Sequence, residues 1–244
     1  MSLRQAGEVM MTSQLGSVLN AAPLLWRGQA YNGQAHNGCV RSMSTGFDEL
    51  DQALPTGGWP PGAVVEVMIP GMDVGELGLW LPVIKRMTQE QRHVIIANPP
   101  YLPYAPVLAN AGIDLDYIRW LSLDDEQDTL CTLEKALRNR ECGMALWWPN
   151  VLGTPSIRGG GLNNSAVRRL QAAAREGESL LGLYRITTDD RAIRQSTWAA
   201  LRLQLHIRQE GGLDIDILKA RGSHHCQSIA LEQKCLTAKI VHRS

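Results

Sequence analysis

Short apolar runs alternate with amphipathic segments through the middle of the chain. The clearest run, Ala63 to Ile69, is apolar at every position except Glu66. A run without polar alternation is typical of a strand buried on both faces of a parallel sheet. Further strands are predicted at 93–97, 118–122, 144–148 and 179–184, and helices between them at 76–91, 104–111, 126–140 and 165–176. This alternation predicts an α/β protein with a mostly parallel central sheet flanked by helices.

Both ends of this series carry additional elements. A short capped helix is expected within 44–54, ahead of the first strand. At the other end, two alternating strands at 199–209 and 213–219 are joined by Glu210-Gly211-Gly212, which predicts a C-terminal hairpin. The helix at 126–140 has two candidate caps, Asp124 and Asp125.

The composition divides the chain into three regions. Residues 1–43 are weakly patterned and are interpreted as an N-terminal arm and linker, and residues 44–222 as the α/β domain. Residues 223–244 lack a clear period of hydrophobic residues and are interpreted as a flexible C-terminal tail, with a short helix at 229–240.

The segment after the first strand has the layout of a phosphate-binding loop. A strand, a glycine-punctuated turn and a helix start can direct backbone N–H groups at an anion. A P-loop also needs Lys followed by Ser or Thr, but here these positions hold Glu76 and Leu77. A carboxylate at the lysine position repels phosphate. We therefore expect a degenerate P-loop that binds no cofactor, formed by Pro70, Gly71, Asp73, Gly75, Glu76 and Leu77.

The charge and the cysteine content limit which classes of binding partner and which cellular compartment fit this chain. The 24 basic and 24 acidic residues give a formal net charge of +0, so any attraction to nucleic acid or a membrane surface must be local. The five cysteines are scattered without C-x-x-C spacing, which favours reduced thiols over disulfides or a zinc site. No apolar run approaches a membrane span, and no signal-peptide pattern is present. We expect a soluble cytoplasmic protein without a metal site.

Six segments form a specific series between residues 24 and 222. In chain order they are Leu25-Trp26-Arg27-Gly28, Thr45-Gly46-Phe47 with Leu50-Asp51, Gly57-Gly58-Trp59-Pro60, Gly75-Glu76-Leu77, the proline-aromatic run from Pro99 to Pro106, and Leu218-Lys219-Ala220-Arg221-Gly222. The series resembles the RecA-like ATPase core and, more specifically, the ImuA family, which is related to RecA and to the SulA cell-division inhibitors.

The resemblance implies a RecA-like core and a role in SOS-induced, error-prone translesion DNA synthesis. The implied partners are an ImuB-like protein, an error-prone DnaE-type polymerase and RecA, with at most a weak DNA contact. Where a Walker B strand needs an acidic residue, the strand at 144–148 ends in Trp147-Trp148-Pro149. Together with the missing lysine and hydroxyl, this predicts a non-catalytic adaptor. Two alternatives stay open, namely a SulA-type inhibitor that binds FtsZ and a weak ATPase with an unorthodox site.

Basic residues form most of the candidate interaction sites. Arg158 lies in a glycine-rich loop, and Arg168 and Arg175 lie near one face of the next helix. In a RecA-like core this side faces DNA, so these arginines are candidates for phosphate contacts; a solvated helix face is the alternative. Lys219 and Arg221 stand one residue apart on the closing strand, and analogy with RecA-like filaments makes them candidates for a protein interface toward RecA.

The remaining candidates are aromatic or acidic. Trp26 lies in a compact apolar anchor within the N-terminal arm. Glu66, on a buried strand, is expected to be a paired structural carboxylate. Five aromatic residues are expected in the core first of all: Tyr101, Tyr104, Trp147, Trp148 and Trp198.

Overall fold

The computed structural model describes residues 42–71, 75–149, 162–186, 195–208, 212–223 and 227–232. The chain divides into two units, 1–33 and 34–244, and all described residues belong to the second. The strands are β1 (Ala63–Ile69), β2 (His93–Ala97), β3 (Ile118–Leu121), β4 (Cys142–Trp147), β5 (Leu180–Ile186), β6 (Leu201–Ile207), β7 (Leu213–Ala220) and β8 (Gln227–Leu231).

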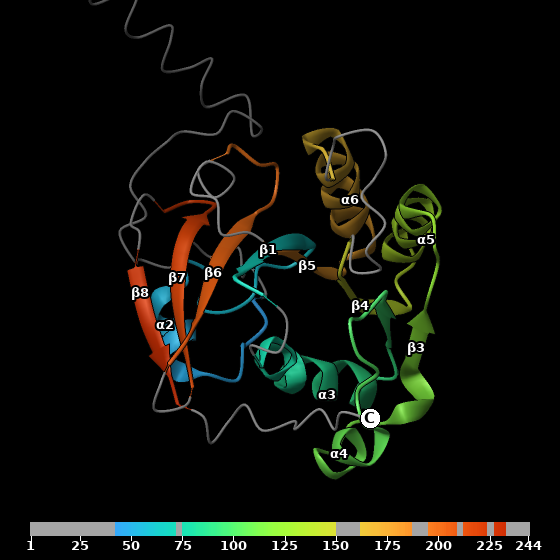
Figure 1. The fold of residues 1–244 in the computed structure, drawn as a ribbon, viewed down its shortest axis with the longest axis horizontal. Helices are drawn as coiled ribbons and strands as arrows, with labels where there is room; N and C mark the ends of the chain where they lie inside the picture. Colours follow the sequence, from blue (N-terminus) through green and yellow to red (C-terminus); the bar gives the residue numbers. More distant parts are fainter. Residues whose placement is uncertain are drawn as a thin grey trace, which may run out of the picture. The chain divides into compact units, whose positions relative to one another are not determined.

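These described strands form one eight-stranded sheet in the order β3-β2-β4-β5-β1-β6-β7-β8 (Figure 1). Every neighbouring pair from β3 to β6 is parallel. The pairs β6 with β7 and β7 with β8 are antiparallel, which confirms the predicted hairpin and adds one strand to it. The predicted α/β class with a mostly parallel central sheet is confirmed.

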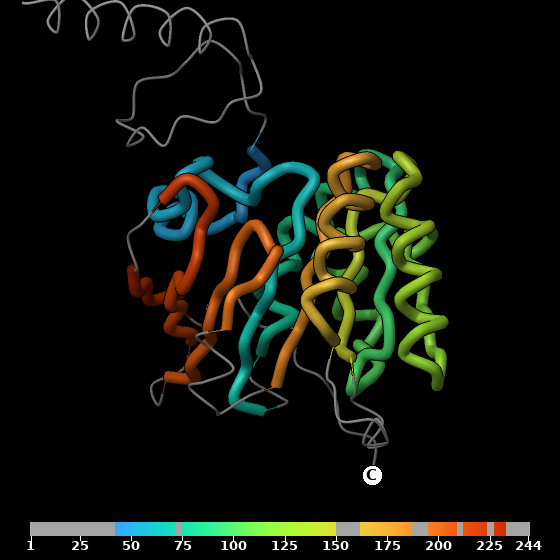
Figure 2. The backbone as a smooth tube through the Cα atoms, turned by 90° about the horizontal axis from the view of Figure 1, so that it is seen from above, coloured from blue at the N-terminus to red at the C-terminus, as the bar shows by residue number. Residues whose placement is uncertain are grey.

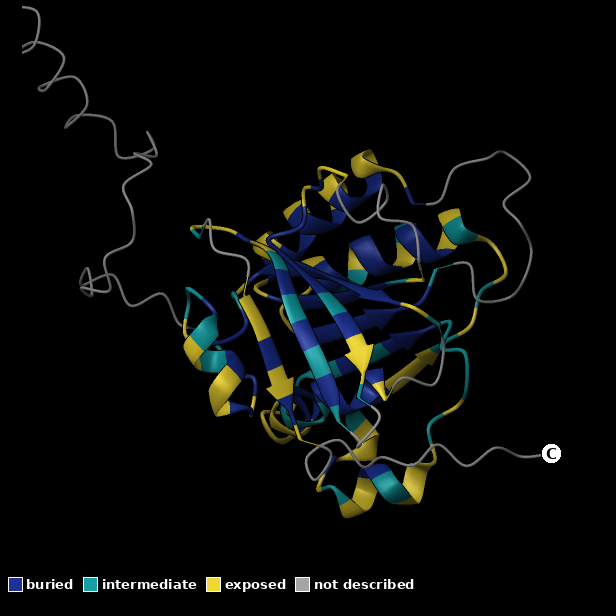
Figure 3. Cartoon of the chain, turned by 60° about the vertical axis from the view of Figure 1, so that its left-hand side comes forward, coloured by how far each residue is buried: buried dark blue, intermediate teal, exposed yellow. Residues whose placement is uncertain are grey.

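Helices cover both faces of the sheet. The α-helices are α2 (Asp48–Ala53), α3 (Leu81–Gln89), α4 (Ala105–Asn110), α5 (Glu126–Arg138) and α6 (Asn164–Gly177), and the 3-10 helices are η1 (Glu76–Trp80) and η2 (Leu115–Tyr117). Residues of α2, η1, α3 and α4 join one apolar cluster, whereas residues of α5 and α6 join a second. Figure 2 shows α5 and α6 side by side, and Figure 3 shows the buried strands of the sheet in dark blue.

β1 lies inside the sheet and contributes to both clusters. All seven of its residues are buried, with Val65 and Val67 in one cluster and Val64 in the other. Its start passes very close to the C-terminal end of α6. Gly62 has φ +58, and a Cβ there would lie 2.9 Å from the Cα of Arg175. This position therefore requires glycine for its backbone conformation and for the close approach.

Two element predictions are wrong in part. The helix predicted over 76–91 is divided into the 3-10 helix η1 and the α-helix α3, and Pro82 lies in the first turn of α3, where proline is tolerated. The helix predicted from Ile229 begins where the structure has β8, whose Ile229 and Leu231 are buried and whose Ala230 is exposed. That two-residue period is the period of a strand with one buried face.

The regions predicted as arm and tail lie largely outside the described residues. Only residues 42 and 43 of the arm and linker are described, and Met43 forms an isolated antiparallel bridge with Trp59. The sheet extends into the predicted tail through β8. Within the described part of the chain, no helix has the length and apolar character needed to cross a membrane.

Candidate functional site

The loop after β1 brings the lysine and hydroxyl positions of a P-loop into the protein interior. Gly75 adopts a left-handed conformation (φ 77°, ψ 19°), and η1 begins at the next residue. Glu76 is 2% exposed and Leu77 is 5% exposed. Pro70 is exposed and Gly71 is half-buried, while Asp73 lies outside the described residues. The two side chains that would have to meet phosphate and magnesium are therefore buried.

Four aromatic side chains lie beside this loop, and we call them the aromatic cluster: Trp59, Trp80, Trp148 and Tyr184. The rings of Trp148 and Tyr184 stack with centroids 4.3 Å apart, and those of Trp59 and Trp80 with centroids 4.5 Å apart. The Trp80 indole N–H donates a hydrogen bond to the Tyr184 hydroxyl (2.6 Å), and this hydroxyl donates to the Glu76 carbonyl oxygen (3.0 Å). The cluster thus joins η1 to the ends of β4 and β5.

The aromatic cluster depends on a small residue in β5. A Cβ on Gly182 would lie 2.9 Å from the Trp80 ring and 2.6 Å from the Leu146 side chain. Glycine at this position therefore permits Trp80 to approach the strand. Burial raises the pKa of Tyr184 well above its usual value, and the nearby Glu76 charge raises it further.

The aromatic cluster lies where an open α/β sheet commonly binds ligands. The connection from β1 leads to α3 on one face, whereas the connection from β4 leads to α6 on the opposite face. A crevice forms at the carboxyl ends of strands where connections diverge in this way. Here β5 lies between β4 and β1, and its Tyr184 stacks on Trp148, directly after β4. Buried aromatic rings thus occupy this part of the sheet.

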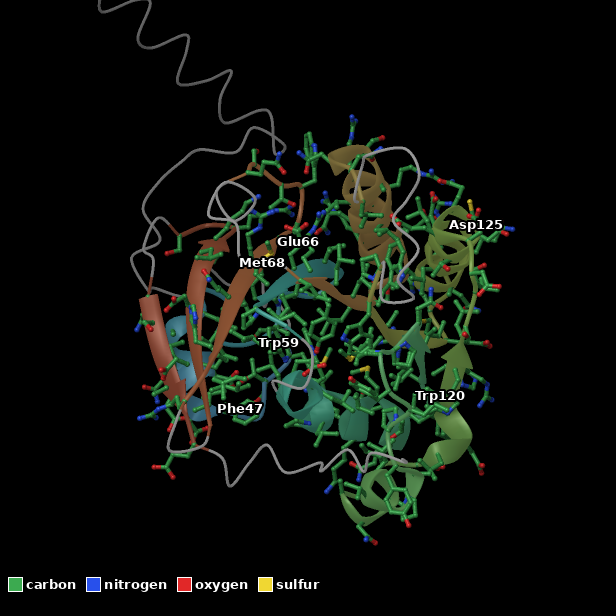
Figure 4. All side chains as sticks on the ribbon, viewed as in Figure 1. Phe47, Trp59, Glu66, Met68, Trp120 and Asp125 are labelled. Atoms are coloured by element: carbon green, nitrogen blue, oxygen red, sulfur yellow. The ribbon has the colours of Figure 1, made fainter. Side chains whose placement is uncertain are left out.

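On the α6 face of the sheet, Glu66 is fully buried between two arginines. Its Oε1 accepts a hydrogen bond from the Arg185 Nε at 2.9 Å, and its Oε2 accepts from Arg202, with Nη2 at 2.8 Å. Glu66 and Met68 lie along β1 in Figure 4. The expectation that Glu66 is a paired structural carboxylate is confirmed. Neither arginine was predicted as its partner, because they lie 119 and 136 residues further along the chain.

The segment Gln195–Trp198, which precedes β6, is held by a contact at each of its four residues. The carbonyl oxygen of Gln195 accepts from Arg202 (2.6 Å), and that of Thr197 accepts from the Lys219 Nζ (2.6 Å). The carbonyl oxygen of Ser196 accepts from Asn164 at the start of α6 (2.8 Å). The Arg168 guanidinium lies over the Trp198 ring, 5.2 Å from its centroid. We call this the 195–198 segment.

The structure brings some candidate residues together and separates others. Arg168 and Lys219 both contact the 195–198 segment, and Arg221 lies two residues beyond Lys219, exposed, with its backbone N–H bonded to the Ala200 carbonyl. Arg175 lies at the other end of α6, beside Gly62. Trp26 and Arg158 lie outside the described residues.

The core prediction for the five aromatic residues is only partly correct. Trp147 and Trp148 are buried, whereas Tyr104 is 52% exposed and Trp198 is 53% exposed. Trp198 stays at the surface because it lies in the segment before β6 and its ring is covered on one side by Arg168 instead of by the core. The cue that was missed is the polar run Gln195-Ser196-Thr197, which places the residue outside the apolar strand that follows.

Burial lowers the pKa of Lys219, and the positive charges of Arg221 and then Arg202 lower it further, with Glu66 opposing them. The charged groups that act on Lys219 are therefore two arginines and one carboxylate. Comparison of the chain with known protein families finds no match, and comparison with curated proteins finds none either.

Proposed function

We propose that this protein is a non-catalytic, RecA-like accessory protein of SOS-induced error-prone translesion synthesis, acting in the cytoplasm as an adaptor. The observation that carries the non-catalytic part is the burial of Glu76 and Leu77 at the lysine and hydroxyl positions of the loop. Phosphoryl transfer needs a cation and a magnesium-binding hydroxyl at those positions. A buried carboxylate and a buried leucine provide neither.

The end of β4 supports the same conclusion. A Walker B strand would present an acidic residue there to hold the magnesium-bound water, but the strand ends at Trp147 and is followed by the buried Trp148. Trp148 stacks on Tyr184, so the side chain at this position contributes to packing. Restoring one catalytic residue would leave the other requirements unmet.

The topology supports a RecA-like core, although by analogy of arrangement only. β1 is followed by a glycine-containing loop and lies inside the parallel part of the sheet. On one side this parallel part continues into the antiparallel hairpin of β6 and β7. Lys219 and Arg221 lie on and just after the second strand of that hairpin, where the resemblance implies a subunit interface. The proposed partners are an ImuB-like protein, RecA and an error-prone DnaE-type polymerase, recognised through surfaces and not through a reaction.

This proposal is tested by a pull-down of the purified chain against an ImuB-like protein, against RecA and against FtsZ. Each pull-down is carried out with and without ATP. Binding to the ImuB-like protein or RecA that does not require ATP is the expected result. Binding to FtsZ alone would contradict it and would favour the division-inhibitor class. The matched control variant is Arg140→Gln, since Arg140 is an exposed arginine paired with Glu178 away from the hairpin. Arg221→Gln is expected to weaken binding and Arg140→Gln to leave it unchanged.

A further inference from the structure

The proline-aromatic run from Pro99 to Pro106 connects β2 to α4 and stays at the surface. Leu102 is 74% exposed, the largest exposed fraction of any large apolar side chain that the structure describes, and Tyr104 is 52% exposed. No residue from 98 to 112 is charged, although 20% of the chain is charged. Exposed aromatic and apolar residues without charges are typical of the centre of a protein interface.

The run is held in place at both ends. Asn98, which precedes it, has a left-handed backbone (φ 48°), and its side chain both donates to the Leu123 carbonyl oxygen and accepts from the Leu123 N–H, each at 2.9 Å. At the other end, the Tyr104 carbonyl oxygen accepts from the N–H of Val107 in the first turn of α4 (2.9 Å). Four prolines fix further backbone angles. A partner that binds this run therefore has little chain entropy to overcome.

Trp120 adds a third exposed apolar side chain on the same side of the sheet. It is the register partner of Ile96, which belongs to the apolar cluster that α4 joins. Register partners on neighbouring strands point to the same face, so Trp120 lies on the face that α4 covers. Because β3 is the outermost strand, Trp120 stays 43% exposed (Figure 4). We call Leu102, Tyr104 and Trp120 the 102–120 surface.

Carboxylates flank this surface. Between residues 113 and 128 the chain has six carboxylates and one cation, Arg119. Three of the carboxylates, those of Asp124, Asp125 and Asp128, are exposed at the start of α5, directly after Leu123. Among the residues that the structure describes, no cation lies within ion-pair distance of these three. They are therefore available to a basic partner.

The open edge of β3 is partly covered by the side chain of Arg119. Its Nη1 donates to the carbonyl oxygens of Asp116 (2.6 Å) and Ile118 (3.0 Å). The Leu121 carbonyl oxygen accepts from the Asn98 N–H and faces β2, so that of Ile118, an odd number of residues away, faces the open edge. A charged side chain along an edge strand opposes pairing with another strand. A partner would therefore contact side chains and not extend the sheet.

We propose that the 102–120 surface binds a basic amphipathic helix of a partner protein. The apolar face of that helix packs on Leu102, Tyr104 and Trp120, and its lysine or arginine side chains lie opposite the carboxylates at the start of α5. Amphipathic helices commonly dock through their apolar face, and exposed Trp and Tyr are frequent anchors of such contacts. The same carboxylates repel nucleic acid and anionic lipid, so a basic protein segment fits best. The inference does not depend on the adaptor function, because it concerns the chemistry of a partner and not its identity.

The test measures fluorescence anisotropy of a labelled synthetic helix with the full chain at low salt. The probe is a peptide of leucine and lysine, about four helical turns long, with leucine at helical spacing. Trp120→Ala and Leu102→Ala are each expected to weaken binding about tenfold, as for the loss of one interface anchor. The matched controls are Trp198→Ala and Ile207→Ala, because both residues are more than half exposed but lie before and on β6, away from β3. Both controls are expected to bind like the wild type.

Charge variants test the flanking carboxylates separately. Asp124→Asn and Asp128→Asn are each expected to weaken binding about threefold, the effect of one exposed ion pair. This loss is expected to disappear at high salt. Glu49→Gln removes the same charge from an exposed site on α2, a helix that packs against β8 at the opposite edge of the sheet, and is expected to leave binding unchanged.

Four results would overturn the proposal. The first two are no binding of the peptide by the wild type at low salt and equal binding by Trp120→Ala and Trp198→Ala. The others are equally tight binding of a peptide with glutamate in place of lysine, and of a peptide with the same composition but no helical period. The probe contains none of the proteins used in the pull-downs described above, so each experiment can fail without changing the outcome of the other.

Discussion

Glu66 shows how one buried side chain organises the α6 face of the sheet. Its carboxylate is fully buried and paired with Arg185 and Arg202, and the two arginines in turn bind the carbonyl oxygens of Leu162 and Gln195. A single carboxylate therefore links two backbone segments that lie far apart in the sequence.

Glu66→Gln is expected to destabilise the protein strongly. The amide keeps the shape but removes the charge, and two arginines remain in a partly or fully buried site without a counterion. Breaking a buried ion pair in this way costs about 3–5 kcal/mol. Urea unfolding measures the effect. The control is Glu90→Gln, which breaks an exposed pair with Arg86 and should cost less than about 1 kcal/mol. Equal losses in the two variants would show that the Glu66 pairs contribute no more than a surface salt bridge.

Tyr184 couples stability to pH at the alkaline end. Its pKa is raised in the folded state, so above the ordinary value of 10.0 the unfolded chain loses this proton while the folded chain keeps it. The free energy of unfolding therefore decreases as pH rises above that value. Tyr184→Phe removes this contribution, and it also removes the hydrogen bond from the Trp80 N–H and the one to the Glu76 carbonyl oxygen, at a cost of about 1–3 kcal/mol. Thermal unfolding should show the advantage of the wild type over Tyr184→Phe shrinking as pH rises through 10; a constant difference would contradict this explanation.

At the scale of elements, the start of α5 has one effective cap. The sequence offers Asp124 and Asp125, and the structure selects Asp125, whose carboxylate accepts from the N–H groups of Gln127 and Asp128. Asp125→Ala is therefore expected to cost about 1 kcal/mol, and Asp124→Ala much less. Chemical denaturation of the two variants checks this, and a larger loss for Asp124→Ala would reverse the assignment.

Elements with a strong apolar pattern could be predicted from sequence, and those with a weak one could not. Ala63–Ile69 and His93–Ala97 have the same bounds in the prediction and in the structure, because each is a short run with a single polar residue and has the length typical of a buried strand. β8 was missed because its five residues, Gln227–Leu231, carry only two buried apolar side chains, and its stability depends on pairing with β7. The 3-10 start at Glu76–Trp80 was missed because it follows from tertiary packing of Trp80 against β5.

The candidate site was predictable only where the chemistry is local. The missing lysine and hydroxyl are adjacent in sequence and could be recognised directly. The partners of Glu66, the stacking of Trp148 on Tyr184 and the contact of Arg168 with Trp198 join residues from different strands and helices. No spacing rule connects such residues, so the aromatic cluster and the 195–198 segment could be found only once the strand order was known.

At the scale of the whole molecule, helices flank a mostly parallel sheet, and the loop after β1 and the end of β4 contribute buried side chains to the packing. Glu76→Lys tests how far this goes. The lysine would stand at the P-loop position, but Leu77 and Trp148 would still be unable to bind magnesium or its water. We expect no ATP hydrolysis above the wild-type background in a phosphate-release assay. Measurable turnover would show that one residue separates this chain from an ATPase.

Thermal unfolding of the wild-type chain with increasing ATP and magnesium shows whether the loop after β1 binds a nucleotide. A ligand that binds the folded state raises the Tm as its concentration increases. At a ligand concentration one hundred times the dissociation constant, it adds about 2.7 kcal/mol to the free energy of unfolding. The buried Glu76 and the packed aromatic cluster predict an unchanged Tm at every ATP concentration. A rise that saturates with ATP would demonstrate a nucleotide site and would contradict the proposal that this loop does not bind phosphate.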